Sequence, residues 1–265
     1  MAGERDTSAA AAPDVLICAG LDPSGGAGFL ADAAIVRALG GRPVGVVTSL
    51  TVQNTEGMRE AHPVDAEVLG DQLRALLTDV EVRAVKLGML GSREIVRALG
   101  EQLGLTRAPV VWDPVGAPTR GTGYAGRELL EGALVDLADH LALITPNTRE
   151  LGFFAGREIA ALDEARRAGK ELAARANTPV LVTGGHLDGD EVIDLLCDRG
   201  SVTELRGPRL PRADVHGTGC ALSSAIATFL GLGHPLDEAC ALAKPHVAER
   251  IANPVRPGRG APAIV

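Results

Sequence analysis

Short apolar runs alternate with longer segments of helical periodicity along most of the chain. Runs rich in Val, Ile and Leu and bounded by Gly, Pro or Asp predict strands at residues 15–19, 44–48, 84–87, 110–113, 142–145, 180–183 and 192–197. Apolar residues at every third or fourth position predict helices at residues 28–39, 66–77, 93–103, 127–139 and 164–176. This alternation indicates consecutive βαβ units.

The first run indicates the kind of sheet. Residues 15–19 are apolar without interruption, as in a strand covered by helices on both faces. We therefore predict an α/β fold, a three-layer α/β/α sandwich with a mostly parallel central sheet. The last third changes pattern, because residues 192–206 predict a hairpin and residues 220–230 and 236–251 predict two helices. Ligands of such sheets bind beyond the carboxyl ends of the strands.

Composition narrows the class of protein. The 265 residues are 46% hydrophobic, enough for one large core, so we expect a flexible leader at residues 1–13 and a single domain at residues 14–265. The net charge of -8 and the lack of a basic block argue against nucleic-acid or membrane-surface partners. Four scattered cysteines and the absence of a long apolar run indicate a reducing compartment and no membrane span.

The strongest local motif is His-Gly-Thr-Gly-Cys at residues 216–220, where a glycine turn leads into a predicted helix. Backbone amides and the helix dipole at such a turn form an anion hole of the kind that phosphoryl transfer requires. Cys220 stands where a base for the attacking oxygen would lie. The alternative is that the glycines merely open a helix and that Cys220 is a small buried hydrophobic residue.

A second glycine-rich segment, residues 19–28, joins the first strand to the first helix. Its glycines let a ligand approach the backbone closely. Gly26 and Gly28 also satisfy a relaxed dinucleotide fingerprint, which expects an acidic residue at the end of the second strand. Residues 48–55 carry amides and hydroxyls there and no acid, which weakens the dinucleotide hypothesis.

Several polar residues near strand ends have two interpretations each. Gln53 and Asn54 can read a heterocycle or cap a turn. Asp32 can accept a hydrogen bond from a substrate or be an exposed helical residue.

The polar and charged residues that follow later strands also have two interpretations each. Asn147 and Glu150 can orient Mg²⁺ and phosphates or form an N-terminal capping box. Lys86 and Asp113 lie at the ligand edge, with a structural Lys–Asp pair as the alternative. The chain has no Walker A motif and no metal-binding histidine spacing.

Taken together, these motifs resemble the hydroxymethylpyrimidine and phosphomethylpyrimidine kinases of thiamin biosynthesis, a branch of the ribokinase superfamily related to pyridoxal kinases. The resemblance extends from Val15 to about Ile251. Its motifs are A-G-x-D-P-S-G-G-A-G at 19–28, Asp32, T-x-Q-N-T at 51–55, K-x-G-M-L at 86–90, D-P-V at 113–115, T-P-N-x-x-E at 145–150, G-G-H at 184–186 and H-G-T-G-C at 216–220.

The resemblance implies a ribokinase-like fold and a role for each matching residue. Cys220 takes the position of the catalytic base, within a turn formed with Gly217, Thr218 and Gly219. A helix N-terminus lowers a thiol pKa, so a thiolate base is expected there. The residues implied to bind the pyrimidine are Gly20, Asp32, Gln53, Met89 and Val115.

The resemblance also implies two cofactors, ATP and Mg²⁺. The residues implied to bind the nucleotide are Asn147, Glu150, Thr183 and Gly185, and Asp113 and Glu150 are implied to bind the metal. A homodimer is expected by the same resemblance, and the reducing compartment indicated by the cysteines corresponds to the cytoplasm.

Three departures from the family pattern bear on the ATP side. Thr183 replaces the usual Lys before Gly-Gly-His, residues 116–121 differ from the usual loop over the substrate, and residues 258–262 only echo a C-terminal glycine motif. Arg120 or Lys244 could supply the missing cation.

The leading hypothesis is an ATP-dependent kinase of 4-amino-5-hydroxymethyl-2-methylpyrimidine, its monophosphate, or both. The alternatives are a pyridoxal or pyridoxine kinase and a non-catalytic pyrimidine sensor of the same fold.

Overall fold

The computed structural model describes residues 12–116, 126–187, 189–198, 200–210 and 215–264. Nine strands form one sheet in the order β3-β2-β1-β4-β5-β6-β7-β8-β9. The strands are β1 (Asp14–Leu21), β2 (Arg42–Asn54), β3 (Gly57–Pro63), β4 (Val82–Leu87), β5 (Val110–Trp112), β6 (Leu141–Ile144), β7 (Val180–Val182), β8 (Glu191–Asp198) and β9 (Ser201–Pro208).

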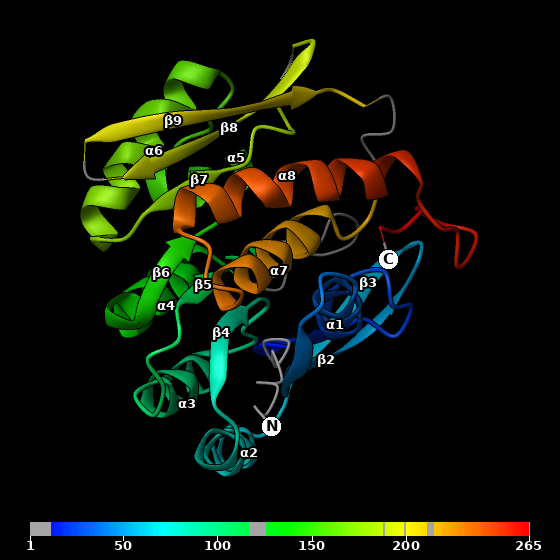
Figure 1. The fold of residues 1–265 in the computed structure, drawn as a ribbon, viewed down its shortest axis with the longest axis vertical. Helices are drawn as coiled ribbons and strands as arrows, with labels where there is room; N and C mark the ends of the chain where they lie inside the picture. The colour runs from blue at the N-terminus through cyan, green and yellow to red at the C-terminus, as the bar shows by residue number, and fades with distance from the viewer. Residues whose placement is uncertain (1–11, 117–125, 188, 199, 211–214, 265) are drawn as a thin grey trace, which may run out of the picture.

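The middle of the sheet is parallel and both of its ends are antiparallel. Strands β2, β1, β4, β5, β6 and β7 pair in parallel. Strand β3 pairs antiparallel with β2, and β8 and β9 complete the other end as a hairpin. These two hairpins form the two ends of the sheet, and Figure 1 shows them well apart. The predicted mostly parallel sheet is therefore confirmed.

Helices cover both faces of the sheet (Figure 1). They are α1 (Gly28–Ala38), α2 (Ala66–Asp79), α3 (Arg93–Leu103), α4 (Arg127–Leu137) with the short 3₁₀ helix η1 (Ala138–His140), α5 (Thr148–Ala155), α6 (Leu162–Ala176), α7 (Thr218–Gly231) and α8 (Leu236–Ala252). In the described part of the chain, none of them has the length and apolar character needed to cross a membrane.

Strand β1 shows how the two cores arise. Val15 and Ile17 point into a core formed with α1, α7 and α8, whereas Leu16 and Cys18 point into a second core with α2 to α6. Alternate side chains of a strand face opposite sides, so an uninterrupted apolar strand requires a helical layer on each side. The predicted three-layer sandwich follows from this division.

One strand was not predicted. Strand β2 continues past residue 48 to Asn54 and turns back as β3, and the side chain of Asn54 accepts hydrogen bonds from the backbone N–H groups of Glu56 and Gly57 at 2.9 and 3.3 Å. This hairpin is largely polar and half exposed, so it lacks the apolar run that identified the other strands.

Two sequence expectations fall partly or wholly outside the described residues. The leader expected at residues 1–13 falls largely in residues 1–11, and the altered loop with Arg120 falls largely in residues 117–125.

Candidate active site

The segments singled out in the sequence meet at one edge of the sheet. The segments after β1, β4, β5, β6 and β7 all leave the carboxyl ends of parallel strands and therefore emerge at the same edge. Helix α7 begins at this edge. A Cβ built on Gly219, in the first turn of this helix, would lie 3.8 Å from Oδ2 of Asp113. The fold thus brings the predicted catalytic turn against the end of β5.

The turn that opens α7 depends on glycine. Gly217 has φ of +88°, and a Cβ there would collide with the carbonyl oxygen of Gly26 in the first glycine loop. Thr218 is the first residue of the helix, and the following Gly219 is exposed. Because the first amides of a helix have no partner within it, they can donate to an anion placed at this end.

The Cys220 thiol is protonated at neutral pH in this structure. Removal from water raises its pKa to about 12, although the positive charge of Lys86 opposes the shift. The expected lowered pKa is therefore wrong, because burial and the carboxylates of Asp32 and Asp113 outweigh the charge of Lys86 and a hydrogen bond with the Gly28 backbone. The thiol is hydrogen-bonded to Asp113.

Asp113 is the carboxylate nearest the turn. It is buried, and it accepts a hydrogen bond from the Ser223 hydroxyl at 3.4 Å. Burial raises its pKa to about 6, with the positive charge of Lys86 opposing and the negative charge of Asp32 adding to the shift. A carboxylate with this pKa can gain and lose a proton near neutral pH.

Asn147 and Glu150 form the capping box at the start of α5. The Asn147 side chain accepts from the backbone N–H groups of Arg149 and Glu150, and Glu150 Oε2 accepts from the Asn147 N–H at 2.9 Å. The capping interpretation is therefore confirmed. Burial and then the charge of Asp113 raise the pKa of Glu150 to about 8.

Lys86 and Asp32 form a buried ion pair beneath the site. The Lys86 Nζ lies 2.5 Å from Asp32 Oδ2, and the Ser224 hydroxyl donates to the other oxygen at 2.8 Å. The alternatives that Asp32 is an exposed helical residue and that Lys86 pairs with Asp113 are both wrong. Both oxygens of Asp32 are engaged, so it would act on a ligand through Lys86.

The other residues expected to bind the pyrimidine lie at or just beyond the carboxyl ends of β1, β2, β4 and β5. Gly20 packs against Met89, whose sulfur would lie 2.7 Å from a Cβ at position 20. Val115 follows Asp113 and donates its N–H to the Asp113 carbonyl at 2.8 Å. Gln53, near the end of β2, is half-buried and contacts His216.

The expected nucleotide segment follows β7. Thr183 forms an isolated parallel bridge with Asn147 and donates its N–H to Pro146 at 3.0 Å. The next residue, Gly184, donates to Asp194, whose other oxygen lies 2.5 Å from Lys244. Lys244 is thus held behind the turn rather than left free to replace the missing Lys.

Gly185 is exposed, with open space where a side chain would be. Its carbonyl accepts from Arg209 Nη1 at 3.1 Å, and Arg209 also donates to the carbonyls of Leu187 and Gly189. This contribution of Arg209 was not predicted. No local sequence signal identifies it, because it reaches the turn from beyond the β8–β9 hairpin.

Among the described residues, no group of three or more His, Cys, Asp or Glu side chains could hold a metal ion. The two buried carboxylates of Asp113 and Glu150 nevertheless fit a divalent cation. The charge of Asp113 raises the pKa of Glu150, and the charge of Asp32 adds to the raised pKa of Asp113, so a cation placed there would relieve the repulsion between negative charges.

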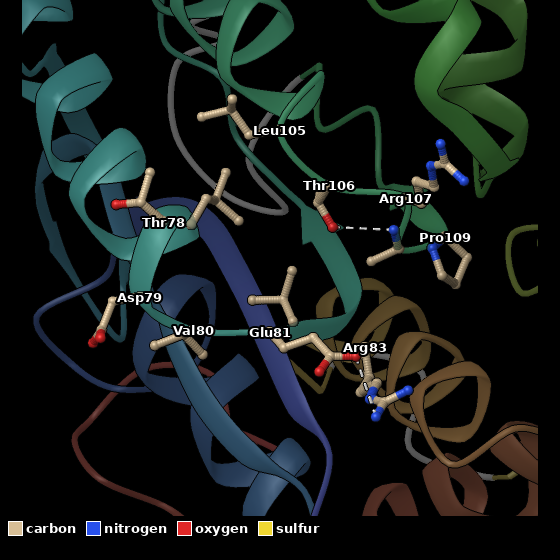
Figure 2. Close-up of a pocket in the computed structure, with 12 residues that line it drawn as sticks. Thr78, Asp79, Val80, Glu81, Arg83, Leu105, Thr106, Arg107 and Pro109 are labelled. Atoms are coloured by element: carbon tan, nitrogen blue, oxygen red, sulfur yellow. Dashed lines mark hydrogen bonds and ion pairs between the residues drawn. The ribbon is translucent and has the colours of Figure 1, made fainter.

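Two of the cavities in the described structure are lined by neither Cys220 nor Asp113. One of about 570 Å³ lies at the opposite edge of the sheet, between the segments that precede β4 and β5 (Figure 2). It contains none of the predicted site residues. The other, about 540 Å³, lies against α5 and is lined by Thr148, Arg149, Gly152, Phe153, Arg157, Glu158, Ile159, Ala160 and His186.

Comparison with known sequences agrees with this geometry. The family model described as phosphomethylpyrimidine kinase matches residues 22–264. A hydroxymethylpyrimidine/phosphomethylpyrimidine kinase of Streptomyces coelicolor is 38% identical over 239 residues, covering 90% of this chain and 88% of the relative. A thiamine biosynthesis multifunctional protein of Corynebacterium efficiens is 42% identical over 233 residues, 86% of this chain but only 31% of that protein.

Solved structures give the same fold. Phosphomethylpyrimidine kinase from Clostridium difficile superposes with a TM-score of 0.77 at 33% identity, over 91% of this chain and 99% of that one. A pyridoxal kinase from Staphylococcus aureus, solved with ADP, has a TM-score of 0.87 at 26% identity, over 96% and 93%. These likenesses confirm the ribokinase-like fold class. With one family model spanning residues 22–264 and these relatives covering most of its length, the chain belongs to the phosphomethylpyrimidine kinase family.

Proposed function

We propose that this chain transfers the γ-phosphoryl group of ATP to 4-amino-5-hydroxymethyl-2-methylpyrimidine, to its monophosphate, or to both. The observation that carries the proposal is the meeting of the α7 turn with Asp113, beside Gln53 and the Gly20–Met89 contact. The names of the relatives support a pyrimidine acceptor.

The α7 turn would stabilise the transition state. Charge on the transferring phosphoryl group spreads over its equatorial oxygens, and the amides that follow Gly217 can donate to them. The glycine at position 219 leaves room for such a group near Asp113.

Cys220 and Asp113 would act together on the proton of the attacking hydroxyl. A thiol with a pKa of about 12 is a poor source of thiolate, whereas Asp113, with a pKa of about 6, is ionised at neutral pH. The hydroxyl proton can pass to the Cys220 sulfur as the thiol proton passes to Asp113. The net result is an alkoxide-like nucleophile and a protonated Asp113.

Glu150 and one oxygen of Asp113 would hold Mg²⁺ together with water and phosphate oxygens, and the other oxygen of Asp113 would take the proton from Cys220. The ion, when bound, neutralises phosphate charge. Asn147, Thr183 and Gly185 would border the nucleotide. Arg149 is exposed on the first turn of α5 and lies near His186. Its guanidinium is a candidate to contact the ATP phosphates in place of the missing Lys.

A product assay tests the proposal. Purified protein with ATP and Mg²⁺ is given the hydroxymethylpyrimidine, its monophosphate, or pyridoxal, and products are identified by mass spectrometry. We expect phosphorylated pyrimidine, with at least about a hundredfold loss of turnover in Cys220→Ala and in Asp113→Asn. Product from pyridoxal alone would favour the pyridoxal kinase alternative.

Binding of pyrimidine by calorimetry without any product would favour the sensor. The cytoplasmic location and the homodimer expected from the sequence stay predictions, and light scattering of the purified protein tests the second.

A further inference from the structure

His216 is the residue of the His-Gly-Thr-Gly-Cys motif to which the proposed chemistry assigns no part. Its ring is largely buried, with 17% of the side chain exposed, and Cδ2 lies 2.9 Å from a Cβ built on Gly26. Its backbone is held on both sides, because its N–H donates to Pro262 at 2.8 Å and its carbonyl accepts from Ile264 at 3.2 Å. The ring therefore has little freedom to turn.

Two side chains meet the same ring nitrogen. His216 Nε2 lies 3.2 Å from Asp22 Oδ2 and 3.1 Å from the Gln53 side-chain nitrogen. Asp22 is ionised at neutral pH: burial opposes ionisation, but hydrogen bonds from His216 and Ser24 outweigh it and lower its pKa. A carboxylate only accepts hydrogen bonds, so the ring nitrogen that faces it must carry a proton. This assignment holds for neutral and for protonated His216.

The proton on Nε2 decides how the Gln53 amide lies. Two N–H donors facing each other at 3.1 Å repel, whereas a side-chain amide turned by half a turn presents its oxygen to the same proton. The favourable arrangement has Nε2–H shared between Asp22 Oδ2 and Gln53 Oε1. The NH₂ group of Gln53 then points away from His216 and both of its protons remain available.

We infer that His216 is a positioning residue that, together with Asp22, fixes the Gln53 amide so that its NH₂ group is presented to the substrate. The inference rests on the proposed function, in which Gln53 reads the heterocycle. It specifies the recognised group as a hydrogen-bond acceptor, such as an unprotonated ring nitrogen. It also links recognition of the pyrimidine ring to the turn proposed to bind the phosphoryl group, since His216 is followed directly by Gly217.

Substitution of Gln53 tests which group faces the substrate. Gln53→Glu keeps the size and the oxygen that accepts from His216 but replaces the NH₂ group with a second acceptor. We expect the KM for the pyrimidine to rise about tenfold or more, with the KM for ATP within about twofold of wild type. An unchanged pyrimidine KM in this variant would overturn the inference.

A matched pair at position 216 tests the positioning role. The amide nitrogen of a Gln side chain can occupy the place of Nε2, whereas that of Asn corresponds to Nδ1. His216→Gln should therefore keep the pyrimidine KM within about threefold, and His216→Asn should raise it about tenfold. Equal KM values in the two variants would show that His216 is only structural.

Wild-type turnover separates this inference from the proposed function. If wild-type protein forms no phosphorylated pyrimidine, the proposed function fails, and calorimetric titration of the pyrimidine into the same variants then replaces KM as the readout. Thermal unfolding of each variant shows that it is folded. Equal pyrimidine affinity of wild type and Gln53→Glu in that titration also overturns the inference.

Discussion

At the scale of single residues, the site contains carboxyl groups whose ionisation is unfavourable in the folded protein. Glu150 has a pKa of about 8, raised from 4.5 by burial and by the charge of Asp113. The unfolded chain ionises this group at lower pH than the folded protein does. Its contribution to stability is therefore present below about pH 4.5 and is lost as the pH rises towards 8.

This titration gives a prediction for Glu150→Gln. Gln can form the same capping box but cannot ionise. We expect the variant to match wild type in free energy of unfolding near pH 4.5 and to become progressively more stable than wild type up to pH 8. Urea unfolding at several pH values measures the difference.

Added Mg²⁺ should narrow the gap between the two proteins at pH 8, because a cation favours the ionised carboxylate. A gap that is the same at every pH would contradict the raised pKa, and a gap unaffected by Mg²⁺ would contradict the proposed metal site.

At the scale of elements, two glycines at the start of α7 are needed for different reasons. Gly217 is needed for its backbone conformation, whereas Gly219 leaves space beside Asp113. A residue other than glycine in the left-handed region costs about 1–2 kcal/mol, before the collision with Gly26 is counted.

The pair Gly217→Ala and Gly219→Ala tests this separation. We expect Gly217→Ala to lower both the free energy of unfolding and the turnover. In Gly219→Ala the new Cβ would lie 3.8 Å from Asp113 Oδ2, an ordinary contact, so stability should stay near wild type while turnover falls about tenfold or more. Normal turnover in Gly219→Ala would show that no phosphoryl group passes there.

Most of these elements could be predicted from the sequence, and the exceptions have physical causes. Helix α3 matches its predicted bounds because Ser92 caps it and apolar residues recur along it. Strand β3 was missed because it is stabilised by pairing with β2 rather than by burial.

For the candidate site, the sequence predicts a set of residues but not the hydrogen bonds and ion pairs among them. The partner of Lys86 is Asp32, 54 positions away, and only the packing of α1 on β1, the strand next to β4, brings them together. The rise in the Cys220 pKa likewise depends on neighbours from other elements.

At the scale of the whole molecule, the C-terminal tail ties distant parts of the chain together. Its Ala261 and Gly260 donate backbone hydrogen bonds to Thr55 at 2.8 and 3.0 Å, and its Ile264 is buried against the α1, α7 and α8 core. Figure 1 shows the end of the chain beside β3. The tail thus holds the β2–β3 turn and His216 at once.

Removal of residues 254–265 tests this role. We expect the truncated protein to fold with reduced stability and to show a raised KM for the pyrimidine, because Thr55 and the backbone of His216 lose their partners. Ile264→Ala is the matched control: it removes buried apolar surface worth about 1.5–3 kcal/mol but keeps the backbone contacts. Equal pyrimidine KM values in the two variants would contradict the role of the tail.

The position of the tail has a consequence for how the protein is made. Synthesis on the ribosome delivers Asp22, Gln53 and Thr55 early, whereas residues 216–264 emerge much later. Domains generally fold as units once their chain is available. A nascent chain therefore carries only one half of the proposed pyrimidine site until residues 216–264 have emerged, and we expect it to bind the pyrimidine only after that point.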